Sequence, residues 1–384
     1  MIRTQLVRLY PNKAMRKHLD DLCDYRRYCW NLGLETWNNM YQESLIMGNK
    51  KLKPSWQKVR NELAHDKQDW QYQLSSRCLQ LTIQDLGKAW QNFFDKARPD
   101  WGKPKFKTKK APRQGFKTDR AKIINGQLRL DKPHGIKEEW HNIEISGAKN
   151  LKGDLKTVSI FKETNKYYAS LPFEVEIKIK CQTKRKTAVD VNVGHLNYTD
   201  GIINTLPKKL QSLYQRIAYY QRLLACKRQV NGKLAYSTNN YVKTRAKLQR
   251  DYHKVANIQN DILHKFTSKL TDNYDTIVIE NLDVKQMQMT HVASKGLQRS
   301  LFGKFRQLLT YKCNWYGKHL VLANRYYPST QRCSNCGYIK QDDDKITLQG
   351  NQKYHTKHNE YICYQCGAVM DRDENAVQNL LALA

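Results

Sequence analysis

The chain has 384 residues, and its 67 lysines and arginines against 35 aspartates and glutamates give a formal net charge of +32. A chain of this length forms two or three domains with their own cores, which excludes a small disulfide-stabilised scaffold. Such a charge excess strains a compact fold unless a polyanion neutralises part of it. We therefore expect nucleic acid as the partner. An anionic membrane is the rival, but we find no clear cationic amphipathic helix or lipid anchor and expect no membrane partner.

The N-terminal residues MIRTQLVRLYPNK alternate charged and apolar side chains and lack the long apolar core of a secretory signal. No segment approaches the ~20 apolar residues of a membrane span. We therefore expect a cytoplasmic protein, where disulfides are rare. Six of the ten cysteines stand singly, and we expect them to be ordinary buried or surface thiols: Cys23, Cys29, Cys78, Cys181, Cys226 and Cys313.

The first elements predicted along the chain are a short strand near residues 3–10 and then helices over 12–96. In one of these helices, apolar side chains recur every three or four residues on one face, as Leu79, Thr82, Leu86, Trp90 and Phe93. Six tryptophans lie in this part of the chain, and we interpret them mainly as helical core. The alternative is that some of them stack on bases. They are Trp30, Trp37, Trp56, Trp70, Trp90 and Trp101.

A basic segment follows at residues 101–118, with seven lysines or arginines and no acidic residue. Its prolines and glycines exclude a helix, so a loop or an extended linker is expected. A solvated tail is the ordinary interpretation of such a run. This one is interior and carries two phenylalanines, which favours contacts with phosphates. The residues expected to make them are Lys103, Lys105, Lys107, Lys109, Lys110 and Arg113.

The rest of the chain changes character near residue 183. Before it, short alternating runs over 119–180 predict a small antiparallel sheet or barrel. After it come an apolar strand in TAVDVNV, a hairpin and two long helical stretches, the second near 238–271. A strand at 276–281, a helix near 297–317, a strand-like run at 319–324 and a terminal helix complete the order. Strands that alternate with helices predict an α/β domain.

Three acidic residues occupy unusual positions in this second part. Asp190 lies inside the apolar strand TAVDVNV, where an ionised side chain costs several kcal/mol of desolvation free energy. Glu280 ends the strand TIVIE, and Asp373 begins the last helix. Taken singly, Glu280 has an ordinary explanation as a strand-end acid and Asp373 as a helix N-cap.

Together, the three acids fit a site that holds two magnesium ions about 3.5 to 4 Å apart against a scissile phosphate. Hard cations prefer oxygen ligands, and carboxylates from neighbouring strands and a helix end can converge at one edge of a sheet. We find no convincing Ser, Cys or His nucleophile. The pattern therefore predicts a metal-dependent nuclease with Asp190, Glu280 and Asp373 as catalytic residues and magnesium ligands.

Four cysteines form two CxxCG motifs, at Cys333 and Cys336 and at Cys363 and Cys366. This spacing allows four thiolates to surround one tetrahedral zinc ion, and the glycine after each second cysteine permits a tight turn. A redox-active CxxC is the alternative, but two matching copies argue against it. We expect one structural zinc. His355 and His358, in the intervening loop, are expected to be surface residues.

An ordered set of motifs in the C-terminal half resembles TnpB, the RNA-guided nuclease of insertion sequences, which is related to the small type V CRISPR effectors. The resemblance covers about 200 residues and rests on VDVNVG at 189–194, NDILHK at 260–265, TIVIENLDV at 276–284, YKCNWYGKHLVLANRYYPSTQRCSNCG at 311–337 and CGAVMDRDENAVQNLL at 366–381. It implies that Asp190, Glu280 and Asp373 are the RuvC-type carboxylates. Asp373 is preferred to Asp371 because the family's third acid stands two residues before an asparagine, here Asn375.

The resemblance also implies a fold and partners. An α/β, RNase H-like (RuvC) nuclease domain is expected at 183–384, with a zinc ribbon at about 326–370. A helical recognition domain at 12–95 and a small β-barrel-like (wedge) domain formed by 1–11 and 96–182 would bind nucleic acid. The implied partners are a guide RNA and a target DNA, with one protein chain per RNA.

The chain departs from the family pattern in two places. NVGHLN at 192–197 follows the first acid where many relatives have a more apolar or basic run, and 26 residues separate the cysteine pairs.

The function expected from these features is RNA-guided, magnesium-dependent DNA cleavage. Base pairing would choose the target, and protein charge would hold the heteroduplex. Three alternatives stay open. They are a guided DNA-binding repressor without cleavage, a transposase that uses the same carboxylates for strand transfer, and an RNA-binding structural protein.

Overall fold

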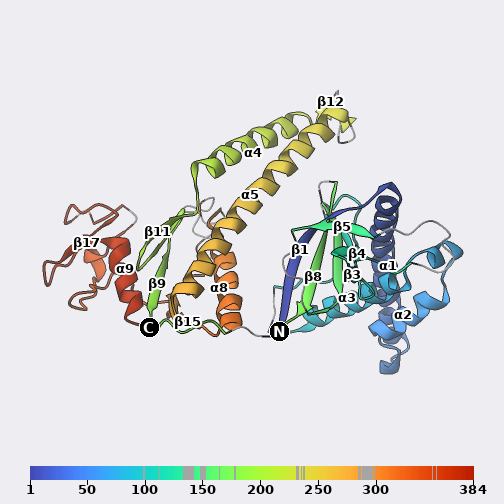
Figure 1. Ribbon diagram of the computed structural model, residues 1–384, viewed down its shortest axis with the longest axis horizontal. Helices are drawn as coiled ribbons and strands as arrows, with labels where there is room; N and C mark the ends of the chain where they lie inside the picture. The colour runs from blue at the N-terminus through green and yellow to red at the C-terminus, as the bar shows by residue number, and fades with distance from the viewer. Residues whose placement is uncertain are drawn as a thin grey trace. The chain divides into compact units, whose positions relative to one another are not determined.

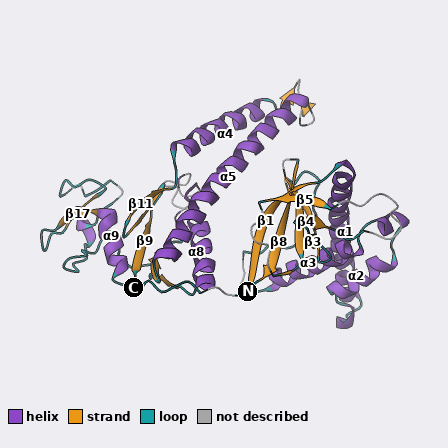
Figure 2. Ribbon diagram, viewed as in Figure 1, coloured by secondary structure: helices purple, strands orange, loops and turns teal. Residues whose placement is uncertain are grey.

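The computed structural model divides the chain into two compact units, Met1–Glu176 and Ile177–Ala384 (Figure 1). The residues it describes are 1–97, 100–111, 113–132, 142–147, 153–163, 165–176, 179–230, 233–234, 236, 238–283, 287, 296, 299–347, 349–351 and 353–384. Both units combine helices and strands (Figure 2), so the predicted mixed α/β class is confirmed. Within these residues, no helix is both long and apolar enough to cross a membrane.

The first unit is an antiparallel sheet with a helical insertion after its first strand. The insertion contains α1 (Lys13–Ile46), α2 (Trp56–His65) and α3 (Ser76–Phe94), with short 3-10 helices at Lys50–Leu52 and Asp69–Gln73. The strands run in the order β2-β7-β8-β1-β5-β4-β3, and β6 also pairs with β8. Their bounds are β1 (Ile2–Tyr10), β2 (Arg113–Thr118), β3 (Lys122–Ile124), β4 (Gln127–Arg129), β5 (Ile143–Ser146), β6 (Asp154–Leu155), β7 (Val158–Glu163) and β8 (Lys166–Glu174).

Strand β1 joins the N-terminus to this sheet by pairing with β8 over almost its whole length, from Ile2 opposite Glu174 to Leu9 opposite Tyr167. The predicted antiparallel sheet is confirmed. No described pair of strands joins β2 to β3 and closes a barrel, so the barrel stays a prediction. The predicted boundary between a helical and a β-domain also stays a prediction, because the helices and the sheet share one hydrophobic core.

The tryptophans divide into core and surface positions. Trp30 and Trp90 are buried, and Trp37 and Trp56 are partly buried and pack against core residues, as the helical periodicity predicts. Trp70 and Trp101 are 41% and 51% exposed. Of the six tryptophans between residues 30 and 101, these two are therefore the exposed ones.

The second unit is built on a mixed sheet with the order β11-β10-β9-β14-β15. The three strands β9, β14 and β15 run parallel, and β10 and β11 form an antiparallel hairpin beside β9. Their bounds are β9 (Lys186–Val191), β10 (His195–Tyr198), β11 (Gly201–Asn204), β14 (Thr276–Ile279) and β15 (His319–Leu322). The strands predicted at 276–281 and 319–324 are present, and each is slightly shorter than expected.

Helices cover both faces of this sheet. On one face, α5 (Asn239–Asn273) and α8 (Phe302–Tyr316) pack on Val189, Val191 and Ile279. On the other face, α9 (Arg372–Leu381) packs on Ala188 and Val278. Figure 1 shows α4 (Lys208–Cys226) and α5 as two long neighbouring helices, with the short pair β12 (Gln229–Val230) and β13 (Lys233–Leu234) at their far end. The helix predicted at 238–271 is confirmed.

The last elements belong to the cysteine-containing segment between β15 and α9. It contains a 3-10 helix at Asp342–Asp344 and the antiparallel pair β16 (Glu360–Ile362) and β17 (Val369–Asp371). Its small core consists of Cys333, Ile346, Tyr361 and Cys363. This core is small, so a metal ion bound by the cysteines would add to its stability.

Candidate metal and nucleic-acid sites

The sheet register places Asp190 and Glu280 on the same face. Val189 of β9 pairs with Ile279 of β14, so each acid is the residue that follows one member of that pair. Neighbouring residues of a strand point to opposite faces. Because Val189 and Ile279 contact α5 and α8, the two acids point to the face that α9 covers.

Asp190 is the most deeply buried of the three acids, with 3% of its surface exposed. Burial and the nearby charges of Glu280 and Asp373 raise the pKa of Asp190 to about 8. The amide of Asn192 donates a hydrogen bond of 2.6 Å to its Oδ2 atom, which partly opposes the shift. The carboxylate therefore lies in a position where negative charge lacks compensation.

Glu280 directly follows β14 and has a hydroxyl partner. Ser329 Oγ donates to Glu280 Oε1 over 2.7 Å. Burial raises the pKa of Glu280, the serine hydrogen bond lowers it, and the charge of Asp373 raises it further. Ser329 lies four residues before Cys333, the first cysteine of the two CxxCG motifs, so the cysteine-containing segment also orients this acid.

Asp371 and Asp373 have different roles at the start of α9. Asp371 is the helix N-cap, because its Oδ1 accepts the backbone N–H groups of Asp373 and Glu374 at 2.9 and 3.2 Å. The Asp373 side chain instead reaches His195 Nε2, 3.1 Å from its Oδ2, and Arg372 Nη2, 3.1 Å from its Oδ1. The ordinary explanation of Asp373 as an N-cap is therefore wrong.

The donor set of these three acids fits divalent magnesium. All the groups are hard oxygen ligands, and the raised pKa values of Asp190 and Glu280 reflect negative charge that a cation would neutralise. The carboxylate oxygens are not gathered as tightly as the thiols. Among the described residues, the four cysteines are the one set of three or more ligand side chains whose atoms all lie within 4.8 Å of one another. Each acid is held toward a protein partner of its own.

The four cysteines predicted as zinc ligands come together. The Sγ atoms of Cys333 and Cys366 are 3.8 Å apart, and those of Cys336 and Cys363 are 3.5 Å apart. A Zn–S bond of about 2.3 Å in a tetrahedron places neighbouring sulfurs about 3.8 Å apart, so the arrangement fits zinc. His355 and His358 are exposed and stand outside this cluster, as predicted.

Each CxxCG motif closes through a turn that needs its glycine. Gly337 and Gly367 have φ angles of +81° and +70°, a left-handed conformation that favours glycine. Their backbone N–H groups donate to the carbonyls of Cys333 and Cys363 at 2.9 and 3.0 Å. The turn fixes the two sulfurs of each motif on the same side.

Two asparagines of α9 join the cysteine-containing segment to the carboxylate face. Asn375 Nδ2 donates to the Arg332 carbonyl over 2.7 Å, and Asn375 Oδ1 accepts the Ser334 N–H over 2.9 Å. One turn later, Asn379 Nδ2 donates to the carbonyls of Ser329 and Arg332 at 2.9 and 2.6 Å. In the sequence, Asn375 served only to choose Asp373 over Asp371, and Asn379 was not identified. Asparagines four residues apart lie on one face of a helix, and this spacing is the signal that could have identified both.

Two cavities flank the acids. One, of about 590 Å³, is lined by Asp373, His195 and Asn197 and by His358 and Asn359 of the cysteine-containing segment. The other, of about 520 Å³, is lined by Glu280 together with residues of α8 that include Phe302 and Arg306. The segment 192–197 and the 26-residue loop between the cysteine pairs, where the chain departs from the family pattern, therefore both line the first cavity.

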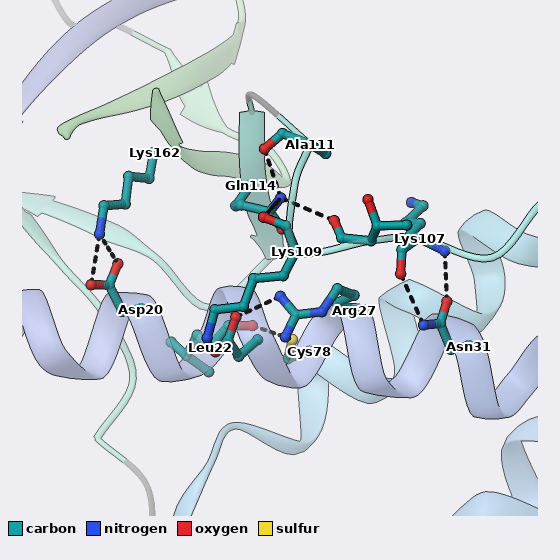
Figure 3. Close-up of polar contacts among 12 residues, drawn as sticks. Asp20, Leu22, Arg27, Asn31, Cys78, Lys107, Lys109, Ala111, Gln114 and Lys162 are labelled. Carbon is teal, nitrogen blue, oxygen red and sulfur yellow. Dashed lines mark hydrogen bonds and ion pairs between the residues drawn. The ribbon is translucent and has the colours of Figure 1, made fainter. Parts of the chain in front are cut away.

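The basic segment lies as an extended strap along α1 (Figure 3). Asn31 of α1 forms two hydrogen bonds with Lys107, donating to its carbonyl at 3.0 Å and accepting its N–H at 2.8 Å. Trp30 Nε1 donates to the Lys105 carbonyl over 3.0 Å. On the other side, the Gln114 amide donates to the Ala111 carbonyl over 2.9 Å. The expected loop is confirmed for residues 101–111, whose backbone is fixed by side chains, whereas Arg113–Thr118 form strand β2 of the sheet.

The six predicted phosphate-binding residues divide into two groups. Lys107 is half-buried with its Nζ 3.6 Å from the centre of the Trp30 ring, and burial lowers its pKa to about 8. Lys109 forms an ion pair with Asp24 at 3.2 Å, and Arg113 lies 3.4 Å from the centre of the Phe161 ring. These three cations are engaged by the protein itself. Lys109 and Arg113 nevertheless stay exposed. Lys103, Lys105 and Lys110 are exposed as well, and Lys103 Nζ lies 5.6 Å from the centre of the Trp90 ring.

Comparison with protein families gives three matches that lie in both units. Residues 302–380 match the Cas12f1-like TNB domain, and residues 170–290 match a family described as "Probable transposase" (OrfB_IS605). Residues 1–45 match a family described as a helix-turn-helix domain of the same OrfB_IS605 group. In this chain, that range contains strand β1 and most of the single continuous helix α1.

Similar proteins are found among curated sequences and solved structures. A Streptomyces pristinaespiralis protein named "Putative RNA-guided DNA endonuclease" is 28% identical over 98% of this chain and 87% of its own length. The TnpB-like protein L79 of Acanthamoeba polyphaga mimivirus is 31% identical over 47% of this chain and 31% of its own length. The fold is similar to that in the cryo-EM structure of a Cas12f1-sgRNA-target DNA complex, with a TM-score of 0.54, 12% identity and coverage of 99% of this chain and 98% of the other. The resemblance drawn from the motifs is thus confirmed, and the chain is similar to the TnpB and IS605 transposase-associated proteins.

Proposed function

We propose that this protein is an RNA-guided, divalent-metal-dependent DNA endonuclease of an insertion sequence. The observation that carries the proposal is the convergence of Asp190, Glu280 and Asp373 on one face of the sheet, with pKa values raised by burial and mutual repulsion for the first two. The second unit would then be an RNase H-like (RuvC) domain. The names of the relatives and the net charge of +32 agree with a guide RNA and a target DNA as partners. One chain per RNA is part of the proposal.

In this proposal the three acids provide oxygen ligands for magnesium, which supplies Lewis acidity at the scissile phosphate. Ser329 holds Glu280 by its hydrogen bond, and His195 holds Asp373. The four cysteines would bind one structural zinc ion. Because Ser329 lies four residues before Cys333, the ion would also hold the backbone around Ser329 in place. The sheet edge and the zinc-bound segment thus fix the acids from two sides.

The test is to express the chain with its native flanking DNA, to sequence the RNA that copurifies and to incubate the complex with matched DNA and magnesium. We expect a discrete bound RNA and cleavage of the matched duplex, with no cleavage of a mismatched one. A complex that binds matched DNA without cutting it establishes the repressor function instead. Joining of cut ends to a second DNA establishes the transposase function.

We further propose that the exposed lysines of the basic strap contact phosphates. Replacing Lys103 and Lys105 together by alanine is expected to weaken binding of a short DNA duplex, because two charge contacts are lost. The slope of log K against log salt concentration should fall in magnitude by about 1.8. Fluorescence anisotropy over a series of salt concentrations measures both quantities.

The matched control removes two exposed charges from the surface of α1, as Lys13→Ala with Lys17→Ala. We expect this pair to leave the salt slope within about 0.5 of the original, since the strap is intact. An equal loss in both double variants would show that only total charge matters, and the strap proposal would then be abandoned.

A further inference from the structure

Strand β10 carries an asparagine directly beside the most buried acid. The antiparallel register of β9 and β10 places Asn197 opposite Asp190, with Leu196 opposite Val191 and Tyr198 opposite Val189. Residues directly opposite each other share a face of the sheet. The neighbours Leu196 and Tyr198 pack into the core under α5 and α8, so Asn197 points with Asp190 toward the α9 face.

The side-chain oxygen of Asn197 is buried, and among the described residues nothing donates a hydrogen bond to it. The whole residue is 5% exposed, and it lines the cavity that also contains Asp373 and His195. The carboxylates of Asp190 and Asp373, unlike the Asn197 oxygen, have polar partners. Asp190 accepts from Asn192, and Asp373 faces His195.

Asn192, His195 and Asn197 all come from one short segment, NVGHLN at 192–197, where the chain departs from the family pattern. Asn192 contacts Asp190, His195 contacts Asp373, and Asn197 lies opposite Asp190 with its oxygen unused. An amide oxygen is a hard, neutral ligand that magnesium, manganese and calcium accept beside carboxylates. A buried oxygen of this kind next to an excess of negative charge is suited to a cation.

We propose that Asn197 is an oxygen ligand of the divalent cation held by Asp190, an inference that rests on the proposed function. The competing explanation is that the Asn197 amide serves Asp190 as a hydrogen-bond donor. Two substitutions separate these explanations, because Asn197→Asp keeps an oxygen ligand and loses the donor, while Asn197→Leu loses both. A ligand role predicts that aspartate rescues cation binding and a donor role predicts that it does not.

The experiment measures the binding of Mn²⁺ alone to the zinc-loaded full chain, by calorimetry and by the electron paramagnetic resonance signal of the bound ion. We expect Asn197→Leu to weaken Mn²⁺ binding by about tenfold or more, as loss of a metal partner does. Asn197→Asp should bind Mn²⁺ at least as tightly as the original chain. Its unfolding temperature should rise more on addition of Mn²⁺, because a fourth carboxylate adds repulsion that the cation removes.

The matched control is Asn204→Ala on the edge strand β11, an exposed asparagine whose side chain accepts the Leu206 N–H at 2.8 Å. It should leave Mn²⁺ affinity unchanged. If Asn197→Asp binds Mn²⁺ as weakly as Asn197→Leu, or if both bind it as the original chain does, Asn197 is not a ligand. If the original chain has no Mn²⁺ site that Asp190→Ala removes, the proposed function itself fails.

Discussion

Replacing Asp190, Glu280 or Asp373 by alanine is expected to reduce cleavage of RNA-matched DNA by about 1000-fold or more. Loss of a hydrogen-bonding partner of a metal ligand typically costs only about 10- to 100-fold, and these acids are the proposed ligands themselves. Binding of the copurified RNA should be unchanged, since the acids lie on the face of the sheet that α9 covers. Single-turnover cleavage with a labelled duplex measures the first effect, and RNA retention on purification measures the second.

Asp371 is the matched control for Asp373, because the two acids are two residues apart and only one of them caps the helix. Asp371→Ala removes the acceptor for two backbone N–H groups and should lower the free energy of unfolding by about 1 kcal/mol. Cleavage should persist in this variant. The opposite pattern, with Asp371 essential and Asp373 dispensable, would overturn the assignment of the third acid.

A charge-neutral variant separates loss of metal binding from loss of folding. The pKa of Asp190 is raised from 3.8 to about 8, so its ionisation destabilises the metal-free fold increasingly as the pH rises through that window. Asp190→Asn removes the ionisable group and with it this loss of stability. Its metal-free unfolding temperature at pH 8 should therefore equal or exceed that of the original chain, although cleavage is lost.

Removal of the zinc site is expected to abolish cleavage as well, through folding of the cysteine-containing segment. Cys336→Ser should reduce the bound zinc from about one ion per chain to near zero, and structural zinc in small domains contributes on the order of 10 kcal/mol. Without the ion, the turn that carries Ser329 loses its support, and Glu280 loses its hydrogen bond. Metal analysis measures the loss of zinc, and hydrogen exchange over residues 329–371 measures the loss of structure in the segment.

Cys226→Ser is the control for this variant, because Cys226 is also exposed and lies outside the metal cluster. It should keep the zinc, the exchange protection of residues 329–371 and the cleavage rate. A chain that is folded and active after Cys336→Ser and complete loss of zinc would refute a structural role for the ion.

The sequence by itself determined the residues whose chemistry is costly or rare. An acid inside an apolar strand, two matched CxxCG motifs and a helix whose apolar residues recur every three or four positions are local patterns, each with a physical reason that does not depend on the rest of the chain. From them came the mixed α/β class, the four cysteines that meet within 4.8 Å, and the three acids that share one face. The choice of Asp373 over Asp371 came from its spacing to Asn375, and the N-cap geometry gives the physical reason for it.

Only the tertiary structure decided which partner each of these residues has. Ser329, His195 and Asn197 lie far from at least one of the acids along the chain, and strand pairing and helix docking bring them close. The same holds for the basic strap, where the lysines look equivalent in sequence. Packing against Trp30 half-buries Lys107, and an ion pair with Asp24 engages the exposed Lys109, while Lys103 and Lys105 are exposed without an ion pair to an acid among the described contacts. Exposure and pairing depend on contacts between distant segments, and no local pattern encodes them.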